Sequence, residues 1–120
     1  LFAPLTPASP DFSWLSKGIT AGIAVSASNP APITTVATCL ADIGGDISRL
    51  RLNGGAKIVD SLTDQGTGNF GNYPLYIGRR GGTTLPFNGR IYQLIIRGAA
   101  SNDGQIAAGE AWCNSKARAY

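Results

Sequence analysis

The chain has 120 residues, of which 43% are hydrophobic and 14% charged, and it carries a formal net charge of +3. This length fits one domain and this composition can fill a core, which argues against wholesale disorder. The ten basic residues are scattered without a run of three, which argues against a dedicated nucleic-acid binder. The sequence contains no apolar run of 18 residues, so it predicts no membrane-spanning helix.

The chain has no histidine and two cysteines, Cys39 and Cys113, without a CxxC motif. A zinc site built from cysteine and histidine is therefore excluded. The two cysteines are either separate buried thiols or a disulfide that ties the C-terminal segment to a sheet. The sequence alone does not decide between these alternatives, because a disulfide depends on a distance.

The first half of the chain predicts an extended arm and then strands. Residues 1–11 contain three prolines, and because proline fixes φ and removes a donor, we expect an arm or linker here. Residues 12–28 predict one or two strands with a turn near Lys17–Gly18. Residues 33–43 are rich in β-branched side chains and predict another strand.

Residues 47–62 (ISRLRLNGGAKIVDSL) predict a hairpin. Alternation places Ile47, Arg49 and Arg51 on one face of its first arm and Ser48, Leu50 and Leu52 on the other. Asn53-Gly54 predicts a two-residue turn, because both residues tolerate positive φ.

A glycine-rich loop and two apolar strands are expected next. Residues 63–72 form a long loop, of the kind that often carries function. Residues 73–78 (YPLYIG) and 90–98 (RIYQLIIRG) predict strands joined by a wide connection over 79–89. Because 90–98 is apolar on both faces, we expect it in the middle of a sandwich or beneath a cover.

The cover is predicted at the C-terminus, where the apolar period becomes helical. Ser101 or Asn102 can cap a helix over about residues 105–116. We expect this helix to dock through Ile106, Trp112 and Cys113, with Trp112 as an anchor to the sheet.

Taken in order, these segments resemble a known family. The segments RLRLNGGAKIV, DQGTGNFGN, PLYIGRRGG, PFNGRIYQLIIRG and QIAAGEAWCN are similar to the C-terminal half of the laminin-G-like, concanavalin-A-like jelly roll. The sequence of these motifs is most similar to a version of the family found in structural proteins of tailed bacteriophages. The resemblance covers residues 12–120 and is most specific over 53–116.

The resemblance implies an all-β fold, an antiparallel β-sandwich of the jelly-roll type with one short C-terminal helix. Residues 12–120 would form this lectin-like domain, and residues 73–78 and 90–97 would lie side by side beneath the helix. A complete domain of the family usually needs more than 120 residues. We therefore expect either that the chain continues upstream of Leu1 or that a neighbour completes the sandwich.

Sugar binding needs an aromatic plate and planar polar groups. The candidates gathered by the loops around 73–78 are Asn69, Phe70, Asn72, Tyr73, Arg79, Arg80 and Asn88. The alternative is that Tyr73 and Tyr76 pack in the core or at its rim. Arg79 and Arg80 would then belong to a solvated turn, with Gly81-Gly82 supplying positive φ.

Catalysis and metal binding have weaker support. Glu110 is the only glutamate, no paired-carboxylate strand pattern occurs, and a Ser-His-Asp triad is impossible without histidine. We predict no cofactor. Calcium is the ion that the family implies, and Asp60, Asp64 and Asn69 could supply some oxygens, although turn-forming and surface roles explain these residues better.

The predicted function is that of a non-enzymatic module in a tailed-phage virion, assembled in the host cytoplasm. It would bind a glycan or protein surface at a tail-fibre tip or as decoration on the capsid or tail. Its partners would be other virion proteins, further copies of itself and a host surface glycan. Two alternatives are an assembly module that locks neighbouring subunits without sugar, and a carbohydrate-active enzyme, which the carboxylate content disfavours.

Overall fold

The computed structural model describes residues 1, 11–20, 22–30, 32–71, 74–79, 84 and 86–120. The predicted arm over 1–11 lies almost entirely outside these residues. The described elements are β1 (Asp11–Lys17), β2 (Gly22–Ser28), β3 (Ala37–Asp42), β4 (Ile47–Leu52), the short 3-10 turn η1 (Asn53–Gly55), β5 (Lys57–Ser61) and α1 (Asp103–Ala117). The described part of the chain is thus mainly strands with one C-terminal helix, and that helix is not long and apolar enough to cross a membrane.

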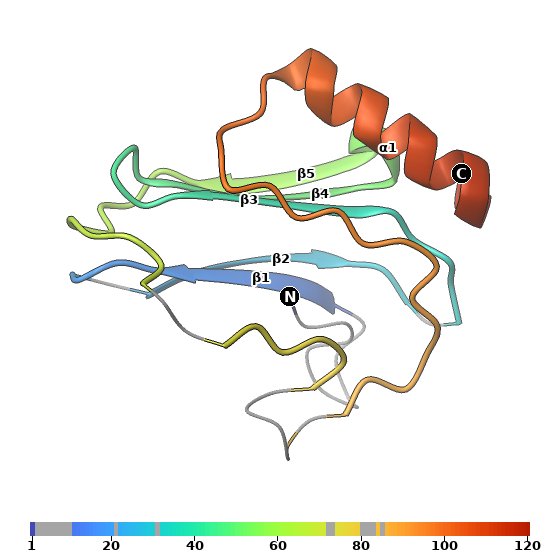
Figure 1. Ribbon diagram of the computed structural model, residues 1–120, viewed down its shortest axis with the longest axis horizontal. Coiled ribbons are helices and arrows are strands. Elements are labelled where there is room, and N and C mark those ends of the chain that lie inside the picture. The colour runs from blue at the N-terminus through green and yellow to red at the C-terminus, as the bar shows by residue number, and fades with distance from the viewer. Residues whose placement is uncertain (2–10, 21, 31, 72–73, 80–83, 85) are drawn as a thin grey trace.

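The strands form two antiparallel sheets. One contains β1 and β2, and the other has the order β3-β4-β5. Figure 1 shows the two sheets stacked in layers, with α1 lying over the outer face of the three-stranded sheet. The order of layers is therefore α1, β3-β4-β5 and β1-β2.

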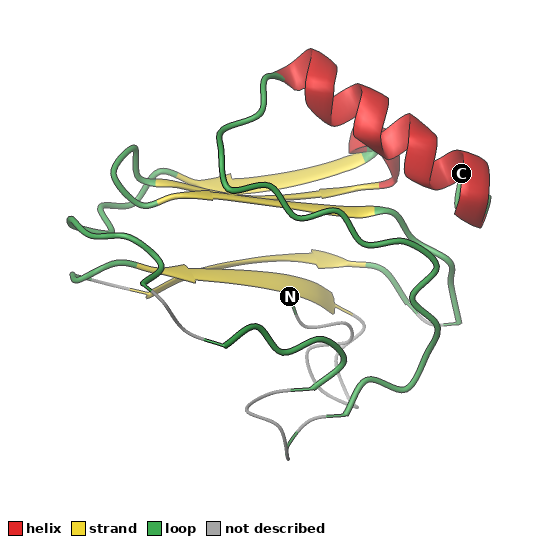
Figure 2. Ribbon diagram, in the orientation of Figure 1, coloured by secondary structure: helices red, strands yellow, loops and turns green. Residues whose placement is uncertain are grey.

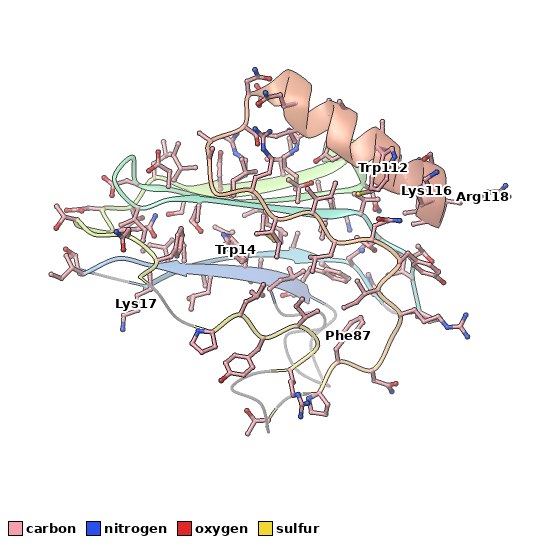
Figure 3. All side chains as sticks on the ribbon, viewed as in Figure 1. Trp14, Lys17, Phe87, Trp112, Lys116 and Arg118 are labelled. Carbon is pink, nitrogen blue, oxygen red and sulfur yellow. The ribbon has the colours of Figure 1, made fainter. Side chains whose placement is uncertain are left out.

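The core lies between the two sheets. Val25 and Ala27 of β2 pack with Leu50 and Leu52 of β4, and the two leucines are only 0% and 1% exposed. Trp14 of β1 packs against this cluster. Its indole Nε1 donates to the Leu40 carbonyl across the sheets at 3.0 Å, so the partly buried ring has its polar group satisfied. Figure 3 shows Trp14 between the layers.

The predicted hairpin is confirmed, with a longer connection than expected. Leu50 and Leu52 face the core while Arg49 and Arg51 face outward, as alternation requires. Leu52 pairs with Lys57, so four residues join the arms instead of two. Asn53, Gly54 and Gly55 all have positive φ. Asn53 also bonds Val36 through its backbone N–H and its side-chain oxygen, extending the β3–β4 pairing beyond the last strand residues.

The first sheet also follows the sequence prediction. β1 and β2 pair from Asp11 with Ser28 to Lys17 with Gly22, and the connection between them begins at Gly18. The strand predicted over 33–43 is present but begins at Ala37. Residues 33–36 precede it without regular structure.

The strands predicted over 73–78 and 90–98 are wrong in this structure. Within the described part of both segments the backbone is irregular (Figure 2). The large apolar side chains of 90–98 are half exposed rather than buried, with exposed fractions of 52% for Ile91, 54% for Tyr92, 53% for Leu94, 51% for Ile95 and 63% for Ile96. The physical reason is that β propensity needs a neighbouring ladder, whereas the core between the sheets is built from side chains of the five strands β1 to β5.

The C-terminal helix is confirmed and slightly longer than predicted. Asn102 caps it in a capping box, because its side chain accepts from the Gln105 N–H while the Gln105 side chain accepts from the Asn102 N–H. Ile106 is buried as expected. Trp112 is not the anchor, since it is 47% exposed and lies below the Lys116 ammonium at 5.9 Å from the ring centre.

Candidate functional site

An open hollow lies between the end of β1 and the glycine-rich loop over residues 63–72. Its volume is about 590 Å³, and residues 14–19 and 67–70 line it. We call this feature the hollow. Its exposed lining includes Phe70, which is 56% exposed, and Lys17 at the end of β1, whose side chain extends away from the strand in Figure 3.

The loop is fastened to β1 by a buried glutamine. Gln65 is 0% exposed, and its side-chain Oε1 accepts from the Ser16 hydroxyl at 2.7 Å. Its backbone N–H donates to Asp46 Oδ1 at 2.8 Å, in the turn between β3 and β4. Its carbonyl accepts from Thr20 N–H at 3.0 Å. Gln65 thus joins both sheets to the loop and holds one wall of the hollow in place.

Two glycines make this approach feasible. A Cβ on Gly18 would lie 2.1 Å from the Gln65 carbonyl oxygen, so only glycine permits the loop to come this close. Gly66 has φ of +79°, and its N–H is held by Asp64 Oδ1 at 2.7 Å. The Ile19 N–H donates to the Thr67 carbonyl at 3.2 Å, and residues 68–70, which follow this bond, line the hollow.

The lining suits binding by contact and hydrogen bonding. Phe70 supplies an exposed aromatic ring, Thr67 a hydroxyl, Asn69 an amide and Lys17 an ammonium group. An aromatic ring with a few polar groups is the arrangement that small ligands and sugars use. Among the described lining residues none is a carboxylate, so the paired acids of glycoside hydrolysis are not gathered here.

Of the predicted site residues, the structure places Asn69 and Phe70 on the hollow. Arg79 and Asn88 are exposed and are not among its lining residues. Asn72, Tyr73 and Arg80 lie outside the described residues. The structure therefore divides the predicted set and adds residues that sequence reasoning missed.

The missed lining residues are Trp14, Lys17 and Ile19. The signal that could have found them is the turn predicted at Lys17–Gly18, because a glycine beside a strand end often marks close approach of another backbone. The sequence did not indicate which backbone would approach.

The three side chains considered as calcium ligands make other contacts. Asp60 pairs with Arg49 at 2.8 Å, Asp64 holds Gly66 N–H, and Asn69 Oδ1 accepts from Gly71 N–H at 2.8 Å. The last two are turn-forming contacts of the kind expected of Asp and Asn. In the described part of the chain no group of three His, Cys, Asp or Glu residues could hold a metal ion.

A buried ion pair lies on the other side of the molecule. Arg51 of β4 donates from Nε and Nη2 to the two oxygens of Glu110 on α1, at 2.9 and 3.0 Å. The side chains are 14% and 3% exposed. By accepting these bonds Glu110 raises the pKa of Arg51. The only glutamate therefore fastens the helix to the sheet, which makes it unavailable as a catalytic acid in this arrangement.

Both cysteines are free thiols, which excludes the disulfide alternative in this structure. Burial raises the pKa of the Cys39 thiol to about 11. Cys39 is thus protonated at neutral pH and is a poor nucleophile.

No protein-family model, no curated protein and no solved structure matches this chain. Its function is therefore inferred from the geometry of the molecule and from the resemblance of its motifs.

Proposed function

We propose that this chain is a non-enzymatic binding module of a tailed-phage virion and that the hollow is its ligand site. The observation that carries the proposal is the exposed ring of Phe70 beside Asn69 and Lys17 on a wall fixed by the buried Gln65. A rigid wall lowers the entropy cost of binding, because little of the site must be ordered when the ligand arrives. The virion setting rests on the motif resemblance alone.

The ligand class that fits best is a surface glycan. Sugars present C–H faces that pack on an aromatic ring and hydroxyls that bond amides, hydroxyls and ammonium groups. The fold would be a jelly roll of the lectin type. The hairpin and the closing helix in the expected order support this fold.

A glycan array of bacterial surface polysaccharides, followed by calorimetry on any hit, tests the proposal. Phe70→Ala is expected to weaken binding about tenfold through the lost ring contact, and Lys17→Ala is expected to weaken it as well. Asn88→Ala is the matched control, since Asn88 is an exposed asparagine away from the hollow. Equal weakening by Asn88→Ala would place the site elsewhere.

A second candidate function is assembly without sugar. It is favoured by the exposed apolar side chains of residues 91–96, because soluble monomers rarely expose contiguous apolar patches beyond a few hundred Å². If no glycan binds and the chain associates with virion proteins, assembly is the function. Loss of polysaccharide viscosity on incubation would instead revive the enzymatic alternative.

A further inference from the structure

Two surfaces outside the hollow are each incomplete in the single chain. The first is residues 90–97, RIYQLIIR, which has the composition of a strand but no strand partner among the described residues. Its apolar side chains are half exposed, and an arginine stands at each end. A segment of this kind seeks an extended neighbour, because unpaired backbone groups and apolar side chains are both satisfied by strand addition.

The second surface is the edge of the three-stranded sheet at β5. Within the described residues β5 pairs only with β4, so its other edge is open. On the outward face of β5 and just beyond it, apolar and acidic side chains alternate. We call this set the β5 strip, and its members are Ile58, Asp60, Leu62 and Asp64. Ile58 is 49% exposed and Leu62 is 71% exposed.

We propose that the β5 strip of one copy receives residues 90–97 of a second copy as an added strand. The two surfaces are complementary in polarity and in charge. One parallel register pairs Ile58 with Ile91, Asp60 with Gln93, Leu62 with Ile95 and Asp64 with Arg97. Cross-strand apolar and opposite-charge pairs of this kind stabilise a sheet.

Pairing of residues 90–97 with the same residues of another copy is less favourable. In an antiparallel two-fold arrangement Arg90 of one copy would lie opposite Arg97 of the other, and like charges directly opposite are destabilising. In the register with the β5 strip the remaining like-charge pair is Lys57 with Arg90. The Lys57 ammonium already donates to the Ser28 carbonyl and is turned toward its own chain.

The contact joins two different surfaces, so it is heterologous. Such contacts propagate from copy to copy and close into rings or extend as filaments, depending on the rotation between copies. This inference concerns surfaces separate from the hollow, and it does not depend on glycan binding.

Sedimentation velocity over a concentration series tests the inference. The wild-type chain is expected to form species larger than a dimer as concentration rises. Ile95→Lys removes one surface and Leu62→Lys removes the other, so each variant alone is expected to remain monomeric. An equal mixture of the two variants is expected to form a dimer and nothing larger, because each partner keeps one intact surface.

Leu75→Lys is the matched control, since Leu75 is 67% exposed and belongs to neither surface. It is expected to assemble like the wild type. Circular dichroism checks that each variant is folded. If a lysine variant does not fold, the charge reversals serve instead: Arg97→Asp weakens association about tenfold, and adding Asp64→Arg in the same chain restores it. A wild-type chain that stays monomeric, or a mixture of the two variants that stays monomeric, would overturn the inference.

Discussion

At the scale of single residues, the ion pairs Arg51–Glu110 and Arg49–Asp60 differ in what they contribute. Arg51 and Glu110 are buried between β4 and α1, whereas Arg49 and Asp60 are 31% and 43% exposed. A buried pair is costly to break, because the remaining charge is left without a partner. An exposed pair contributes little, because water and salt screen it.

We therefore expect Glu110→Gln to lower the free energy of unfolding by about 3 kcal/mol. The isosteric change Asp60→Asn on the exposed pair is expected to alter it by less than about 1 kcal/mol. Urea unfolding of dilute protein, followed by tryptophan fluorescence, measures both values. Similar losses for the two variants would show that the buried pair does not fasten the helix.

The sequence predicted that Arg51 shares a strand face with Ile47 and Arg49, but not that Glu110 is its partner. The two residues are 59 positions apart. The alternation of side chains along a strand does not indicate which element covers that face of the sheet. A usable signal was present in the helix, because Ile106 and Glu110 are four residues apart and therefore share a face. A glutamate on the apolar face of a helix indicates a buried basic partner.

At the scale of elements, α1 contains a glycine that its surroundings do not require. A Cβ on Gly109 would meet nothing within 4 Å, and glycine within a helix costs about 1 kcal/mol relative to alanine. Gly109→Ala is thus expected to raise the thermal midpoint by several degrees, about 4 °C or more. Differential scanning calorimetry measures the shift.

Gly18→Ala is the matched comparison, and it is expected to lower the midpoint. Its Cβ would collide with the Gln65 carbonyl at 2.1 Å and push the loop away from β1. If both substitutions lower the midpoint, the outer face of α1 at Gly109 is covered by something that the single chain does not show.

Elements with local signals were predicted well, and those that depend on distant partners were not. The helix cap at Asn102 and the alternation of β4 depend only on residues that are close in sequence, and both are confirmed. Residues 90–98 have the composition of a strand, but strand formation depends on a neighbouring backbone at the right distance. The hollow depends on the same kind of long-range approach, through Gln65 and Ser16, 49 positions apart.

At the scale of the whole molecule, protection against hydrogen exchange should differ sharply along the chain. The β4 amides at Leu50 and Leu52 lie in the central strand under fully buried side chains. They are expected to exchange last, through global unfolding. Residues 90–97 have no strand partner within the described chain, so in dilute protein their amides are expected to exchange at rates close to those of unstructured peptide.

Raising the protein concentration separates the two accounts of that segment. If residues 90–97 add to the β5 edge of a second copy, protection is expected to appear together in 90–97 and in β5, while β4 is unchanged. The Leu62→Lys variant should show neither increase, because its β5 strip carries a charge where the apolar contact is needed. Strong protection of 90–97 at every dilution would mean that the strand predicted from the sequence forms within one chain, which would contradict both the irregular backbone and its pairing with a second copy.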